Sequence, residues 1–281
     1  MFTPINKAHA IVEAVVFIEF IPDLSGSMTS LRGLVDNLKD ELPAADMQQM
    51  FRVELKAEGS SVGVAPSMSF GLRRIAPNGM PMWIMQVGPN AISVHCLDYS
   101  RWATVWPKCN KYLSHAFKSL GAVPVEVGAV GWKVVDRFLH IGEIATYDAS
   151  QLFRRDSSVL HGRAFNSEAR WHCHTGWFDR LGADSGFDGR NVLNQLNIDS
   201  GMNLVEGKTQ AIVTVDHTLM LRKASDGDLA VFASPAEGTD TPLHRLVGLF
   251  HKRNKRVLGE LLTEQMAKSI ALNVETDDVY R

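Results

Sequence analysis

Two histidines separated by one residue, His172 and His174, are the side chains of this 281-residue chain that best match a metal-binding pair. On a strand, alternate residues point to the same face, so both imidazoles would share a face and Cys173 would point to the other. A zinc site needs further ligands, and His140 or His161 would have to approach through folding. Because these further ligands have no recognisable spacing in the sequence, we expect no metal and no cofactor. If the protein is instead a metal-dependent hydrolase, His172 and His174 are the candidate ligands.

A second motif is typical of a nucleophilic serine. Gly59-Ser60-Ser61-Val62-Gly63 matches G-x-S-x-G, which in hydrolases places the serine on a sharp turn between a strand and a helix. The residues that follow, Val64-Ala65-Pro66, do not begin a helical pattern. We therefore expect a hairpin loop here.

A third motif is similar to part of a phosphate-binding loop. Gly207-Lys208-Thr209 matches its end, but Met202 occupies the position of the required first glycine. The β-branched run that follows, 211–215, predicts a strand where that motif needs a helix. The sequence therefore excludes a nucleoside triphosphatase of this type.

His217 is the remaining catalytic candidate, and the pattern around it favours a structural role. It is in phase with the apolar residues Val213 and Val215, so we expect a hydrogen-bonded histidine in the core. Its neighbour Asp216 would point to the other face of the strand. The two residues therefore cannot form a simple dyad.

Four basic side chains lie in one short segment of the predicted C-terminal helix, 251–256. A solvent-exposed helix face is the usual meaning of such a cluster, and we favour it. The alternative is a contact with an anion or a nucleic acid. That contact would use Lys252, Arg253, Lys255 and Arg256.

The composition limits the partners and the compartment. The chain has 29 basic and 31 acidic residues, so its formal charge of −2 does not favour a general polyanion binder. Three cysteines are too few for a disulfide scaffold, which favours a reducing compartment, and we expect a cytoplasmic protein. Glu13 and Glu19 interrupt the first apolar run, and no run is long enough to span a bilayer, so we expect no membrane partner.

Hydrophobic periodicity predicts the elements that would position these side chains. Helices are expected over 28–42, 102–120 and 242–262, with Pro107 kinking or restarting the second helix. The expected strands are 11–20, 51–57, 67–75, 82–87, 91–97, 127–141, 169–178, 191–198 and 211–221.

This order of elements predicts an α+β fold with two lobes, each a mainly antiparallel β-sheet covered by long helices. The N-terminal lobe would be residues 1–141, in the order strand, helix, four strands, helix, strand. The C-terminal lobe would be residues 142–281 and end in a long helix, with a break near 142–155. In both halves, strand segments precede a long helix.

Four segments together resemble a known family. They are 8–20, the tyrosine and tryptophan helix start at 98–102, the glycine-containing strand at 127–138, and the terminal helix at 243–264. In order and spacing they resemble the sporadically distributed family of uncharacterised prokaryotic proteins of about this length. That family has no established activity, and its patchy distribution implies mobile-element or defence loci.

These observations favour a noncatalytic module that binds a protein partner or a small ligand, as an accessory or sensor component of such a locus. Two alternatives stay open. One is a hydrolase or metal-dependent enzyme that uses His172 and His174. The other is a nucleic-acid binder that uses the basic helix, which we favour less.

Overall fold

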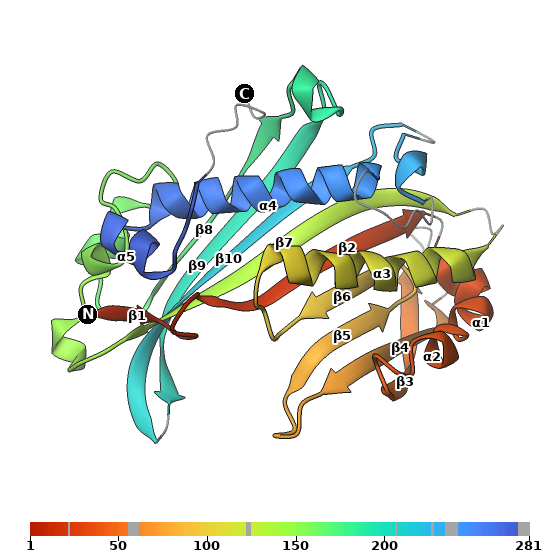
Figure 1. The fold of residues 1–281 in the computed structure, drawn as a ribbon, viewed down its shortest axis with the longest axis horizontal. Helices are drawn as coiled ribbons and strands as arrows, with labels where there is room; N and C mark the ends of the chain where they lie inside the picture. Colours follow the sequence, from red (N-terminus) through yellow and green to blue (C-terminus); the bar gives the residue numbers. More distant parts are fainter. Residues whose placement is uncertain are drawn as a thin grey trace. The chain divides into compact units, whose positions relative to one another are not determined.

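The computed structural model describes residues 1–21, 23–55, 62–121, 125–205, 207–225, 228–233 and 241–274. Most of the predicted strands are present, several with longer bounds (Figure 1). The strands are β1 (Phe2–Pro4), β2 (Ile11–Ile21), β3 (Ala44–Leu55), β4 (Val62–Ile75), β5 (Pro81–Val87), β6 (Ala91–Cys96), β7 (Glu126–His140), β8 (Trp171–Arg180), β9 (Asn191–Val205) and β10 (Lys208–Arg222).

Two long helices and several short ones complete the described elements. The α-helices are α1 (Met28–Leu31), α2 (Leu34–Asn37), α3 (Trp102–Leu120), α4 (Pro242–Leu261) and α5 (Glu264–Ser269). The 3-10 helices are η1 (Leu24–Ser27), η2 (Ile144–Thr146), η3 (Ala149–Gln151), η4 (Gly162–Asn166), η5 (Ala183–Ser185) and η6 (Ala230–Ala233).

The predicted fold class, two lobes with a sheet each, is wrong. The strands form one ten-stranded sheet in the order β3-β4-β5-β6-β2-β7-β10-β9-β8, with β1 paired to β7. Pairing is antiparallel between β1 and β7, along β3–β6 and along β8–β10. The two halves are joined because β2 and β7 are neighbours in this order. Alternation along a strand predicts which face is buried, but it does not specify the partner strand.

The two halves of the chain nevertheless share one topology. In the first half, β2 lies beside β6, the last strand of the meander β3–β6, and α3 follows. In the second half, β7 lies beside β10, the last strand of the meander β8–β10, and α4 follows. Each half thus places a long strand beside the last strand of the meander that follows it.

Contacts divide the chain into two compact units. Unit 1 consists of Met1–Ala14, Gly131–Leu221 and Leu243–Arg281. Unit 2 consists of Val15–Val130 and Arg222–Pro242. The predicted lobes 1–141 and 142–281 stay a prediction.

In unit 2, α3 packs on β6 and on the short helices α1 and α2. Trp83 of β5 meets Tyr112 of α3 edge to face, with ring centroids 5.9 Å apart. The helix predicted over 28–42 is interrupted, and Gly33 separates α1 from α2, as expected of a residue with low helix propensity. Its apolar stripe is still buried, because Met28, Leu31, Leu34, Leu38 and Leu42 are all at most 5% exposed. Of the two outcomes predicted at Pro107, a kink or a restart, the restart is wrong, since α3 runs through Pro107; the kink stays a prediction.

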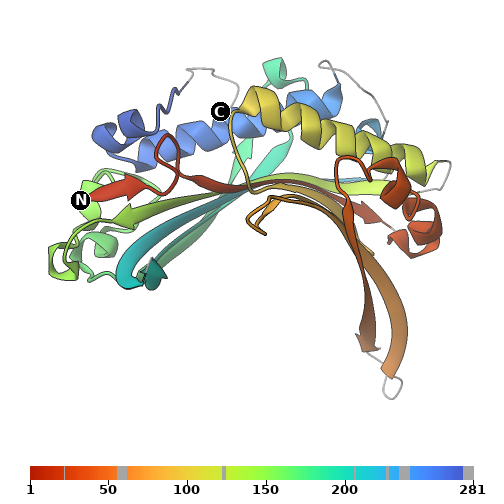
Figure 2. The same cartoon turned by 60° about the horizontal axis from the view of Figure 1, so that its bottom comes forward.

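In unit 1, the long helix α4 covers one face of the sheet segment β8–β10 (Figures 1 and 2). The strands and helices contribute alternate apolar residues to a common core. Its members include Phe138, Leu196, Ile198, Val213, Val215, Val257, Leu258 and Leu261. The opposite face of the sheet carries polar side chains, such as the ion pair between Lys133 and Asp216 at 2.7 Å.

None of the helices in the described ranges combines the length and the apolar character that crossing a bilayer would require.

Candidate functional site

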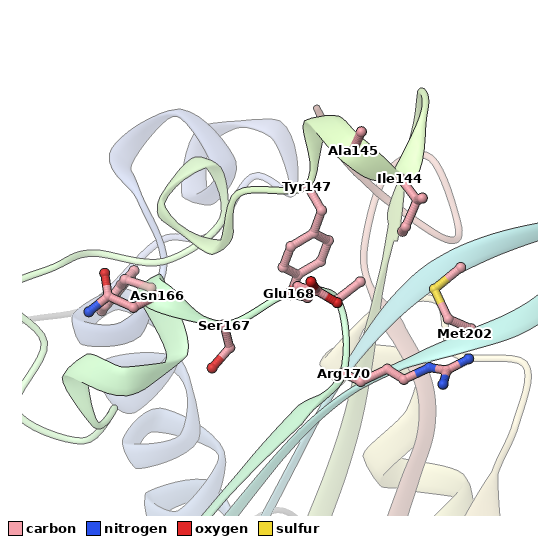
Figure 3. Close-up of a pocket in the computed structure, with 10 residues that line it drawn as sticks. Ile144, Ala145, Tyr147, Asn166, Ser167, Glu168, Arg170 and Met202 are labelled. Atoms are coloured by element: carbon pink, nitrogen blue, oxygen red, sulfur yellow. The ribbon is translucent and has the colours of Figure 1, made fainter.

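A cavity of about 700 Å³ lies in unit 1, in the size range of sites for small ligands (Figure 3). The segment that connects β7 to β8 supplies most of its wall, and β9 supplies one residue. The lining residues are Ile144, Ala145, Tyr147, Phe165, Asn166, Ser167, Glu168, Ala169, Arg170 and Met202.

The hydroxyl of Tyr147 is fixed by a chain of hydrogen bonds. The indole Nε1 of Trp171 donates to it at 2.9 Å, and Ser200 Oγ lies 2.8 Å from it and donates in turn to the carbonyl of Ala169 at 2.9 Å. Indole can only donate and a carbonyl can only accept, so Tyr147 must donate to Ser200. The chain holds the tyrosine ring in place as a wall of the cavity.

Burial raises the pKa of Tyr147 above its ordinary value, although the hydrogen bonds with Ser200 and Trp171 lower it. The phenol is therefore neutral at physiological pH. Its proton is already engaged with Ser200. Tyr147 is thus a fixed hydrogen-bonding wall of the cavity, and it is not poised as a base.

Local turns and strand pairing position the other lining residues. The Thr146 hydroxyl donates to the carbonyl of Glu143 at 2.7 Å, and the Ser167 hydroxyl donates to the carbonyl of Arg163 at 2.9 Å. Both bonds stabilise tight turns of the connecting segment. The pairing of β8 with β9 begins at Trp171 and Ser200, so Met202 lies just beyond the start of β8.

Three polar side chains line the cavity with their hydrogen-bonding groups still available. Within the described ranges, the side chains of Asn166, Glu168 and Arg170 make no hydrogen bond or ion pair with the protein. Figure 3 shows Arg170 extending on the Met202 side, whereas Asn166 lies on the opposite side. The lining therefore combines an amide, a carboxylate and a guanidinium with side chains that are otherwise mainly apolar.

The histidine pair lies outside this cavity. His172 and His174 are exposed on one face of β8, with ring centroids 5.2 Å apart, and His174 Nε2 lies 3.1 Å from Asp199 Oδ1. The shared face of the two imidazoles is confirmed. His140 does not join them, because it is buried against Phe2 and Tyr147.

The described part of the chain contains no group of three or more histidine, cysteine, aspartate or glutamate side chains arranged to hold a metal ion. The expectation that His172 and His174 bind no metal stays a prediction.

The structural role predicted for His217 is confirmed. The ring is 2% exposed, with Nδ1 2.9 Å from Asn254 Oδ1 and Nε2 3.2 Å from Asn194 Oδ1. Burial lowers the pKa of His217 to about 4, so the ring is neutral at physiological pH. Asp216 points to the other face, where it pairs with Lys133.

The basic side chains of α4 differ in their surroundings. Lys252 is exposed, whereas Arg253 is largely buried and donates from Nε to Asp179 Oδ2 at 2.7 Å. Lys255 and Arg256 are half-buried. A solvent-exposed face therefore describes Lys252 but not Arg253. A contact between these residues and a nucleic acid stays a prediction.

The two remaining motifs have different outcomes. Gly207 has a φ of +79° and lies between β9 and β10, whose first residues are Lys208 and Thr209, so a hairpin replaces the phosphate loop. The first three residues of the G-x-S-x-G motif, 59–61, lie outside the described residues. The loop predicted there stays a prediction.

Sequence reasoning missed the residues around the cavity. Tyr147, Glu168 and Arg170 lie in a connection between β7 and β8 that contains only short 3-10 helices. No motif marks them. The available signal was the length of this connection, because long connections in compact domains are uncommon and often functional.

No protein family, no curated protein and no solved structure matches the chain.

Proposed function

We propose that this protein is a noncatalytic binding module that holds a small ligand with both charged and apolar parts in the cavity around Tyr147. The observation that carries the proposal is the set of three side chains, Asn166, Glu168 and Arg170, which line the cavity without protein partners. The guanidinium suits a carboxylate or phosphate of the ligand, and the carboxylate suits an ammonium group.

The apolar residues of the lining suit the apolar part of the ligand. Ile144, Phe165 and Met202 supply aliphatic, aromatic and thioether surface, and methionine adapts its shape to irregular partners. The fixed Tyr147 ring reduces the entropy lost when a ligand binds, since that wall is already ordered. A free amino acid or a similar zwitterion with an apolar side chain fits this lining best.

Isothermal titration calorimetry with a panel of amino acids and related zwitterions tests the proposal. We expect saturable binding that weakens about tenfold in Arg170→Gln and in Glu168→Gln, because each variant removes one charge-assisted contact. Arg137→Gln is the matched control, since Arg137 is an exposed arginine of β7 outside the lining. Absence of binding across the panel, or equal weakening by the control, would contradict the proposal.

The resemblance to the sporadically distributed prokaryotic family stays part of the proposal. It supports the role of an accessory or sensor component, because a binding module without chemistry of its own suits that role. The two alternatives have less support: His174 is engaged with Asp199, and Arg253 is engaged with Asp179.

A further inference from the structure

We propose that a second cavity of unit 1 binds a small tetrahedral oxyanion, carried by a phosphorylated metabolite. This cavity has a volume of about 380 Å³ and lies at β8, the last strand in the sheet order. It is lined by His161, Arg163, Ala164, Ser167, Trp171, His172 and Cys173. The proposal does not depend on a ligand in the first cavity.

The charge of the lining favours an anion. Arg163 carries a permanent positive charge, and the imidazoles of His161 and His172 add two groups that can donate hydrogen bonds. As far as the structure describes this lining, it contains no carboxylate, in contrast to the first cavity with Glu168. Phosphate groups are recognised by this combination of arginine and imidazole donors.

The hydrogen bonding of His161 prepares one donor. Its Nδ1 accepts a hydrogen bond from the backbone N–H of Arg163 at 3.1 Å, as the cap of η4. In the neutral ring the proton must therefore reside on Nε2, which is left to donate to a ligand. The Arg163 side chain makes no hydrogen bond or ion pair within the described ranges, so its guanidinium is also available.

The acidic residue of β9 that is paired with His172 in the strand register is engaged with the other histidine of the pair. Asp199 is opposite His172 in the register of β8 and β9, but both its carboxylate oxygens lie within 3.3 Å of His174 Nε2. The Trp171 indole is likewise held by Tyr147. The Trp171 wall is therefore fixed, while the exposed side chains of Arg163 and His161 keep their donors.

Amide NMR titration of the intact protein with inorganic phosphate and with ribose 5-phosphate tests this site. We expect saturable shifts at Ala164 and Cys173 and at the Trp171 indole, with tighter binding of ribose 5-phosphate because the cavity exceeds the size of the bare ion. Arg163→Gln should weaken both ligands about tenfold, as expected for one lost charge-assisted contact.

Two further variants make the outcome decisive. His161→Asn keeps a side-chain cap for η4 but removes the imidazole donor, so it should weaken binding severalfold without unfolding the turn. Arg170→Gln changes the first cavity and should leave phosphate binding unchanged. Tighter binding of phosphate than of ribose 5-phosphate would identify the free ion as the ligand and contradict the metabolite. Absence of saturable shifts, or an affinity that Arg163→Gln leaves unchanged, would overturn the site itself.

Discussion

A buried carboxyl on β7 makes the stability of unit 1 depend on pH. Asp136 is 2% exposed, and its Oδ1 has no hydrogen-bond partner among the described residues. Burial raises the pKa of Asp136 from 3.8 to about 7. The folded protein therefore retains the proton of this carboxyl up to nearly neutral pH, whereas the unfolded chain loses it near pH 4.

Asp136→Asn should remove this pH dependence. The stability that Asp136 contributes as a neutral acid is complete below about pH 4 and is lost as the pH rises to about 7, a loss on the order of 4 kcal/mol. Urea unfolding at pH 5 and pH 8 measures it. The free energy of unfolding of the variant, relative to that of the wild type, should be higher at pH 8 than at pH 5. A difference that is the same at both pH values would contradict the raised pKa.

At the scale of elements, a buried ion pair joins α4 to the edge strand β8. Arg253 and Asp179 have side chains only 12% and 14% exposed, with Nε and Oδ2 2.7 Å apart. Asn194 of β9 also donates to Oδ2 of Asp179, at 3.0 Å. The same helix and strands enclose His217, which stacks on Trp177. Polar groups thus fix how the helix lies on this part of the sheet.

Arg253→Met should destabilise the protein by about 3 to 5 kcal/mol, because it leaves the Asp179 carboxylate buried without its cation. The double variant Arg253→Met with Asp179→Asn should recover much of that loss. Chemical unfolding of the two single variants and the double variant measures the coupling. Lys268→Met is the control, since the Lys268–Glu264 pair is exposed and should contribute little. Additive effects in the cycle would show that the pair is not coupled.

The sequence predicted most elements because their local patterns are strong. The helix predicted over 102–120 has the bounds of the observed α3, and the strand predicted to start at Asn191 starts where β9 does. The broken helix at Gly33 and the single sheet were not predicted, since helix interruption and the choice of strand partners depend on tertiary packing. The cavity was missed for a related reason. Glu168 and Arg170 line a cavity with Tyr147 and with Met202 of β9 only once the β7–β8 connection has folded against β9.

At the scale of the whole molecule, the buried His217 and the half-buried His251 make the folded state sensitive to acid. Burial lowers the pKa of His217 and of His251 to about 4. The unfolded chain takes up these protons near pH 6.5, so this stability is present above pH 6.5 and is lost as the pH falls to about 4. Protonation of Asp136 raises the free energy of unfolding as the pH falls over the same range. The combined loss from the two histidines is larger than this gain.

The free energy of unfolding should therefore fall between pH 6.5 and pH 4. The contribution of each histidine is on the order of 3 kcal/mol, because the pKa of each shifts by about 2.5 units. His217→Gln should flatten this part of the curve by about that amount. Chemical unfolding across the range checks it, with His95→Gln, a half-buried histidine of β6 in unit 2, for comparison. A wild-type curve as flat as that of His217→Gln would rule out the neutral buried ring.

The central claim, a noncatalytic module with its ligand in the cavity around Tyr147, is tested most directly by mapping a bound ligand. We would saturate the protein with the tightest zwitterion from the calorimetric panel, record amide NMR shifts, and analyse the recovered ligand by mass spectrometry. We expect the largest shifts at Ala145, Tyr147, Ala169 and Met202, with the ligand recovered unchanged. Shifts centred elsewhere, or a ligand that has been chemically converted, would contradict it.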